Sequence, residues 1–165
     1  MTNVRVVRAD YANPVHAAAL VALLDAYALD PMGGSEGLSD FAKTALVPAL
    51  SARPQAFSVL AFAGEDDSTP VGLVNCIEGF STFACKPLVN VHDVAVLIDY
   101  RGQRIGEQML ELVETLARER GACKLTLEVL SGNGGAVKLY QRVGFGNYAL
   151  GDTMGSANFM QKWLS

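Results

Sequence analysis

The chain has 165 residues, of which 50% are apolar and 18% charged, and this composition suits a folded domain rather than a disordered chain. Its net charge of -4 argues against a nucleic-acid partner, because nucleic-acid-binding domains are usually basic. No stretch reaches the ~18 apolar residues of a membrane span, and the first residues lack a secretory signal. We therefore expect a cytoplasmic protein with a single domain over residues 1–165.

The first third of the chain predicts one strand and two helices. Val4 and Val6 indicate a short strand. Asn13 and Pro14 are typical of a helix start, and apolar residues then recur at helical spacing over roughly 14–29. The turn-forming run 30–34 ends that helix, and a second helix is expected over 38–50, capped by Ser39 or a neighbour.

The middle of the chain predicts three strands, over 56–63, 71–80 and about 88–98, the first two joined as a hairpin by a polar turn at 65–68. An amphipathic helix follows the third strand, and Gly121 is typical of its end. Beyond it we expect a strand over 124–130, a short helix over 136–142, and two closing strands near 145–149 and 157–163.

This order of elements predicts an α/β (α+β) protein. The β-α-β unit in the middle implies a parallel pair of strands with a right-handed crossover, whereas the hairpins imply antiparallel neighbours. The expected architecture is a mixed sheet with helices on its faces.

Cys76, Cys85 and Cys123 are scattered along the chain, without a CxxC pair or a set of Cys and His ligands. This spacing predicts thiols in a reducing compartment and no metal site.

The most informative segment is the loop Arg101-Gly102-Gln103-Arg104-Ile105-Gly106, between an apolar strand and the amphipathic helix. Backbone N–H groups at a helix N-terminus can bind a phosphate, and two guanidiniums stand beside them. An ordinary strand-to-helix turn would also use two glycines, so the loop alone leaves both interpretations open. It is neither a P-loop nor a dinucleotide fingerprint.

A second motif, Asn133 to Phe145, narrows the choice. Together, Tyr100 to Gly106 and the set Asn133, Leu139-Tyr140 and Gly144-Phe145 resemble the two signatures of the GCN5-related N-acetyltransferase (GNAT) family. The resemblance is firm over about residues 70–146. It implies the acyl-CoA N-acyltransferase fold, in which a mostly antiparallel sheet contains a splayed parallel pair and has helices on both faces.

The resemblance also implies acetyl-CoA as co-substrate. Backbone groups of Val94, Ala95 and Val96 would bind pantetheine, and the N–H groups of residues 101–106 would bind the pyrophosphate. Asn133 and Tyr140 would contact the cofactor from the second motif. The family usually has glycine where this chain has Arg104, so that side chain must point away from the phosphates or cover them.

Tyr140 matches the family's general acid, which returns a proton to the leaving thiolate. A phenol of pKa about 10 can donate its proton to a thiolate whose thiol has a pKa near 8.5. The alternative is an aromatic side chain that only packs. For the general base, His92 is the leading candidate because histidine titrates near neutral pH, and Asp93 and Glu78 are its rivals. Residues 92 and 93 face opposite sides of a regular strand unless a bulge intervenes.

Phe80-Ser81-Thr82-Phe83, Pro87 and the pair His92-Asp93 resemble a diamine acetyltransferase-like subgroup. In that subgroup the pair is Glu-Asp rather than His-Asp, so the resemblance is only a weak guide to the substrate of this chain.

The function expected is acetyl transfer to a primary amine of a small molecule by direct attack, with residues 30–37 as one wall of the acceptor site. A non-catalytic acyl-CoA-binding module and a peptide or protein N-acetyltransferase remain alternatives. The family implies a possible homodimer, with neither nucleic acid nor membrane as partner.

Overall fold

The computed structural model describes residues 3–64 and 68–164, and the chain forms two compact units, residues 1–127 and 128–165. The first unit contains a five-stranded sheet in the order β1-β2-β3-β4-β5. Its strands are β1 (Val4–Arg8), β2 (Ala56–Ala63), β3 (Thr69–Ser81), β4 (Lys86–Val96) and β5 (Leu125–Leu127). Its helices are α1 (Pro14–Leu29), α2 (Asp40–Ser51) and α3 (Ile105–Glu119), with 3-10 turns η1 (Pro31–Gly33) and η2 (Ile98–Tyr100).

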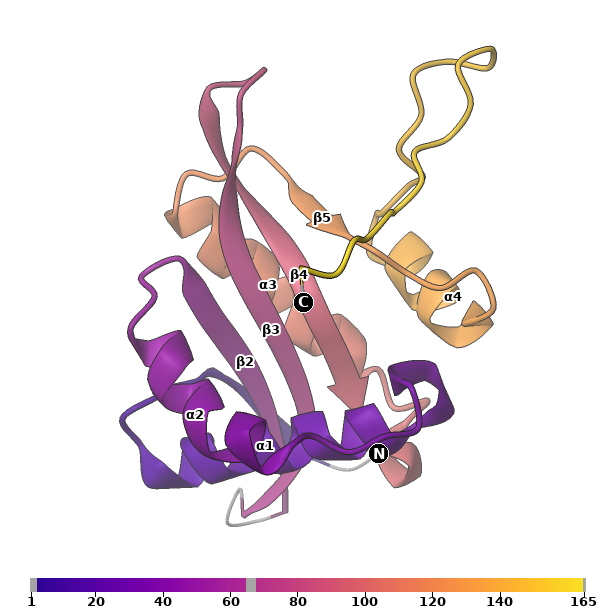
Figure 1. Cartoon of the computed structure of the whole chain (residues 1–165). Coiled ribbons are helices and arrows are strands. Elements are labelled where there is room, and N and C mark those ends of the chain that lie inside the picture. Colours follow the sequence, from indigo (N-terminus) through magenta and orange to yellow (C-terminus); the bar gives the residue numbers. More distant parts are fainter. Residues whose placement is uncertain (1–2, 65–67, 165) are drawn as a thin grey trace. The chain divides into compact units, whose positions relative to one another are not determined.

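The sheet is mixed, as predicted. Strands β1 to β4 pair antiparallel in succession, whereas β4 and β5 are parallel and are joined through α3. Helices α1 and α2 cover one face and α3 covers the other (Figure 1). The fold class expected from the sequence is therefore confirmed.

Side-chain caps fix where the first two helices begin. The side chain of Asn13 accepts hydrogen bonds from the backbone N–H groups of Val15 and His16, and Pro14 occupies the first turn. Ser39 caps α2 by accepting from the N–H of Ala42. These contacts satisfy N–H groups that the helices themselves leave unpaired. They confirm the predicted start of α1 and the cap at Ser39, although α2 begins at Asp40 rather than at residue 38.

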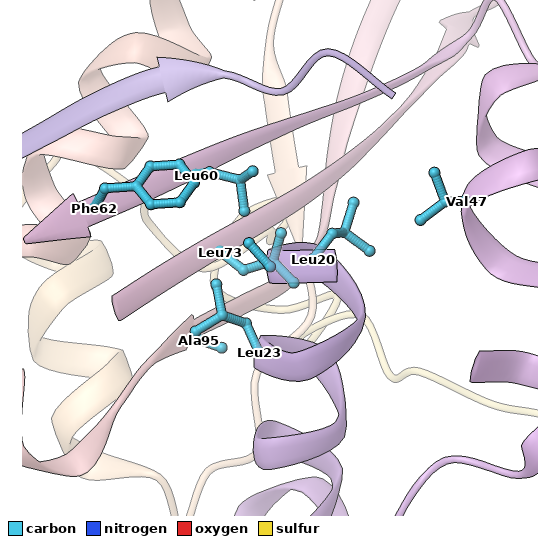
Figure 2. Close-up of a cluster of buried hydrophobic side chains, with 8 residues drawn as sticks. Leu20, Leu23, Val47, Leu60, Phe62, Leu73 and Ala95 are labelled. Atoms are coloured by element: carbon cyan, nitrogen blue, oxygen red, sulfur yellow. The ribbon is translucent and has the colours of Figure 1, made fainter. Parts of the chain in front are cut away.

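Each face of the sheet has its own core. On the α1 side, Leu20 and Leu23 pack with Leu60, Leu73 and other buried side chains (Figure 2). On the α3 side the side chain of Met109 lies against Gly72. A Cβ atom there would lie 2.9 Å from Cε of Met109 and 3.3 Å from Cβ of Ala61, so Gly72 makes room for α3.

The structure corrects several boundaries. Strand β4 ends at Val96, because residues 98–100 form η2, and β5 has three residues rather than the seven expected over 124–130. The polar turn expected at 65–68 lies, apart from residue 68, outside the described residues.

The second unit contains α4 (Gly134–Arg142), close to its predicted bounds. The two closing strands were wrongly predicted, since the described part of this unit holds one isolated bridge, between Ala149 and Ser156. Phe159 and Trp163 are exposed in that segment. An alternating pattern becomes a strand only where a partner supplies a hydrogen-bond ladder. The expected single domain over 1–165 stays a prediction.

The core on the α1 side predicts a large cost for Leu20→Ala. Leu20 is fully buried, so the substitution leaves a cavity that costs about 2–5 kcal/mol of unfolding free energy. Val15→Ala on the same helix is the control, because Val15 is 60% exposed and should change stability little. Urea denaturation measures both, and equal effects would contradict this account of the core.

Candidate functional site

The candidate site lies at the edge of β4. Strand β5 pairs only with Val89, Asn90 and Val91, whereas β4 pairs with β3 as far as Val96. In the described residues of the first unit, β4 therefore has no strand on its second side from residue 92 to residue 96. This open stretch follows directly after the parallel pair.

The ladder shows which backbone groups face the opening. The N–H of Leu97 donates to the carbonyl of Val71 on β3, and bonding direction alternates along an antiparallel strand. Ala95 therefore directs its backbone groups toward β3, and Val94 and Val96 direct theirs outward. The carbonyl of Val96 accepts from Nε of Arg101 at 3.0 Å, which agrees with this direction.

The loop after β4 is shaped by two residues with positive φ. Gly102 has φ +77° and Arg104 has φ +60°, a left-handed conformation that favours glycine. Arg104 is also the N-cap of α3, and no side chain caps that helix. The start of α3 thus lacks a capping hydrogen bond from its N-cap side chain, and a helix N-terminus is an end that attracts anions.

Arg101 has a structural partner that the sequence did not predict. Its Nη2 atom donates to Oδ2 of Asp30 at 2.8 Å, between the loop and the end of α1. The guanidinium holds the pKa of Asp30 below its usual value, with help from the N–H of Met32. Arg101 therefore joins β4 to the start of η1, and in the described residues the structure gives the exposed Arg104 side chain no such partner.

A β-bulge brings His92 and Asp93 to one face. Asp93 pairs with Asn75, but the next pair along the ladder is Val91 with Cys76, so His92 is the extra residue. On β3 the partners of Asn90 and Asp93 are Ile77 and Asn75. These two residues lie two positions apart, so they share one face of the sheet, the face that α1 covers. The contact of His92 with Asn90 places it there too.

Asp93 ends a row of hydrogen bonds that crosses the sheet, here called the Asp93 chain. Nδ2 of Asn75 donates to Oδ2 of Asp93 at 3.0 Å, Oγ of Ser58 donates to Oδ1 of Asn75 at 2.6 Å, and the hydroxyls of Tyr11 and Ser58 lie 2.8 Å apart. The proton of Ser58 is already used, so Tyr11 must donate to it. Burial raises the pKa of Tyr11, which keeps that donor protonated.

Sequence reasoning missed Tyr11, Ser58 and Asn75. A signal was present for the last two, because each is a polar residue inside an apolar strand that the structure buries. Buried polar side chains are normally hydrogen-bonded, so such interruptions predict a network across the sheet.

Glu78 lies on the other face. Its Oε2 accepts from Nη1 of Arg120 at 2.9 Å, and that guanidinium stacks 4.7 Å from the ring of Phe57. Arg120 ends α3, so this carboxylate belongs to the α3 side, away from His92 and Asp93. Its catalytic role stays a prediction.

The second unit holds the other two candidates. Oδ1 of Asn133 accepts from the N–H of Ala136 and caps α4. Tyr140 is 9% exposed and meets the ring of Phe145 edge to face, with centroids 5.9 Å apart. The packing role considered for Tyr140 is therefore present, and its role as an acid remains a prediction.

A separate cavity of about 650 Å³ lies between α1 and α2, beside the ion pair of Asp25 and Lys43 at 3.3 Å. None of the predicted site residues lines it. Within the described ranges, no three His, Cys, Asp or Glu side chains gather as a metal site would require, and no helix has both the length and the apolar character for crossing a membrane.

Comparison with known proteins identifies the family. The model of the acetyltransferase (GNAT) family matches residues 20–145, so the chain belongs to this family and the resemblance seen in the sequence is confirmed. An uncharacterized N-acetyltransferase of Methanocaldococcus jannaschii is 32% identical over 85 residues, 51% of this chain and 38% of that protein. Streptothricin acetyltransferase of Streptomyces lavendulae is 35% identical over 78 residues, 46% of this chain and 41% of that protein. The match thus spans about two fifths of the length of these relatives.

Solved structures agree on the fold. The crystal structure of a probable acetyltransferase has a TM-score of 0.76 at 22% identity and covers 95% of this chain and 99% of its own. Aminoglycoside N-acetyltransferase AAC(6')-Iy in complex with CoA has a TM-score of 0.72 at 18% identity, covering 98% and 96%.

The left-handed backbone of Arg104 generates a test. Arg104→Gly and Arg104→Ala both remove the guanidinium, but only glycine relieves the strain of the positive φ, so the pair isolates the backbone effect. We expect the alanine variant to be less stable than the glycine variant by about 1 kcal/mol in the free energy of unfolding. Chemical denaturation of the two variants measures the difference, and equal stabilities would contradict the strained conformation.

Proposed function

We propose that this chain is an acetyl-CoA-dependent N-acetyltransferase that acts on a primary amine of a small molecule. The observation that carries the proposal is the edge of β4 from residue 92 to residue 96, which no strand of the first unit's described residues covers and which leads to the N-terminus of α3. Family membership supports the reaction class. The names of a streptothricin and an aminoglycoside acetyltransferase among the similar proteins favour an amine-bearing small molecule.

The donor substrate fits the exposed backbone groups. The outward carbonyl of Val94 and the outward N–H of Val96 can pair with the amides of pantetheine, which leaves the N–H of Val94 for the thioester. The N–H groups at the start of α3 can receive the pyrophosphate, and Arg104, at the N-cap of that helix, can add its guanidinium. Acetyl-CoA supplies the activated thioester carbonyl.

The α1 side of β4 suits a cationic acceptor. Burial raises the pKa of the Tyr27 phenol, and the nearby carboxylates of Asp93 and Asp30 raise it further. Asp30 is ion-paired with Arg101, so the carboxylate of Asp93 is the negative charge that favours an approaching ammonium. Residues 30–37, which follow α1, form a wall of the acceptor site in this proposal.

The reaction forms one bond and breaks one. The amine nitrogen attacks the thioester carbon, the C–S bond then breaks, the amine proton passes to His92, and Tyr140 protonates the leaving thiolate. The N–H of Val94 polarises the carbonyl as negative charge develops on its oxygen. Positioning of the two substrates at the edge of β4 supplies a large part of the rate enhancement.

Release of free CoA thiol from acetyl-CoA, measured with a panel of primary amines, tests the activity. We expect thiol release above the rate without amine for at least one diamine or aminosugar, and mass spectrometry should show the acetylated product. Acetyl-CoA binding without amine-dependent release would favour the non-catalytic binding module. Release with peptide amines alone would favour a peptide N-acetyltransferase.

The role of Tyr140 has its own test. Tyr140→Phe removes only the hydroxyl and keeps the ring contact with Phe145, so we expect turnover to fall by about 100-fold or more with little change in affinity for acetyl-CoA. Tyr148→Phe, at a residue 61% exposed in the same unit, is the matched control. Unchanged turnover in Tyr140→Phe would remove the hydroxyl from the mechanism.

A further inference from the structure

The ring of His92 contacts the side chain of Asn90, and this contact bears on the position of the ring proton. Its Nδ1 atom lies 2.6 Å from Oδ1 of Asn90, the neighbour on the same face of β4. Asn90 in turn reaches β5, where its Nδ2 atom lies 3.1 Å from Oγ1 and 3.4 Å from the backbone oxygen of Thr126. These three residues are called the His92 chain.

The backbone oxygen of Thr126 sets the direction of each hydrogen bond in the His92 chain. A backbone carbonyl can only accept, so the amide of Asn90 must turn its NH₂ group toward Thr126 and its oxygen toward His92. An amide oxygen also only accepts. Nδ1 of neutral His92 must therefore carry the proton, which leaves the lone pair on Nε2.

The other histidine has the opposite arrangement. Nδ1 of His16 accepts from the backbone N–H of Asp10 at 3.0 Å, so the proton of neutral His16 must be on Nε2. The chain contains two histidines, and the structure predicts a different tautomer for each. His16 is thus an internal reference for His92.

We propose that Asn90 is a positioning residue that holds His92 as its Nδ1–H tautomer, so that the basic nitrogen Nε2 accepts the proton of the attacking amine. The part of the proposal that concerns acyl transfer rests on the proposed function. The side chain of His92 is exposed, so Nε2 lies within reach of a substrate. Asn90 itself touches no reacting atom and acts through His92.

Nitrogen-15 NMR of the histidine rings tests the tautomer without any substrate. The full chain is labelled at histidine and measured at about pH 8, where an ordinary histidine of pKa about 6.5 is neutral. Ring nitrogens with and without a proton give well-separated signals, and a His16→Gln variant assigns them. We expect Nδ1 of His92 and Nε2 of His16 to be protonated, and an unprotonated Nδ1 in His92 would overturn the proposal.

Two variants separate positioning from mere folding. Asn90→Leu keeps the size of the side chain and removes the acceptor, so the signals of His92 should move toward a mixture of tautomers while those of His16 stay. Asn90→Asp keeps an acceptor and should retain the Nδ1–H form. An unchanged His92 in Asn90→Leu would show that Asn90 does not set the tautomer. If Asn90→Leu fails to fold, the spectra of the wild type and of Asn90→Asp still decide.

Kinetics tests the catalytic half separately. With an active amine, Asn90→Leu should lower kcat about tenfold with an unchanged KM for acetyl-CoA, less than the 100- to 10,000-fold that a whole general base contributes. Asn90→Asp should recover most of this loss. A shifted tautomer with unchanged kcat would exclude Nε2 as the base, and absence of turnover in the wild type would refute the proposed function while leaving the tautomer result intact.

Discussion

The backbone hydrogen bonds of β4 are the constraint on which the candidate site depends. A strand has polar groups on both edges, and in the described part of the first unit β4 lies between two strands, β3 and β5, from Val89 to Val91 only. Beyond that point β3 still fixes the strand rigidly, while the other edge is left with groups that point outward. The same strand then runs into the loop at Gly102 and the start of α3. A rigid strand with an open edge and an adjacent helix N-terminus is therefore the consequence of β5 being short.

The bulge at His92 determines which chemistry faces the α1 side. Without an extra residue, the alternation of a strand would put His92 and Asp93 on opposite faces. With it, the Asp93 chain and the His92 chain lie on one face, each anchored on a neighbouring strand. Asparagine amides cannot pass a proton along such a row. Both chains therefore serve to orient their terminal groups rather than to conduct protons away.

Sequence reasoning located the helices, their caps and the central hairpin because those features are local, as with Asn13 and Ser39. It failed where distant residues decide. Two closing strands were expected near residues 145–149 and 157–163, yet a strand also needs a partner, and the described part of that segment holds one isolated bridge, between Ala149 and Ser156. The base could not be chosen from the sequence either, because a single extra residue in β4 sets which side chains share a face. Arg101 looked available for phosphate, but Asp30, 71 positions away, binds its guanidinium.

The two arginines of the loop therefore differ in what they contribute. Arg101 uses its charge within the fold, where Nε and Nη2 bond to β4 and to Asp30. Arg104 holds a left-handed backbone that costs a non-glycine residue roughly 1–2 kcal/mol, and the fold gains no contact from its side chain among the described residues to offset that cost. Glycine would meet the backbone requirement without strain. In the proposed function an anion binds at the start of α3, and there the guanidinium of Arg104 would add a positive charge that strengthens anion binding.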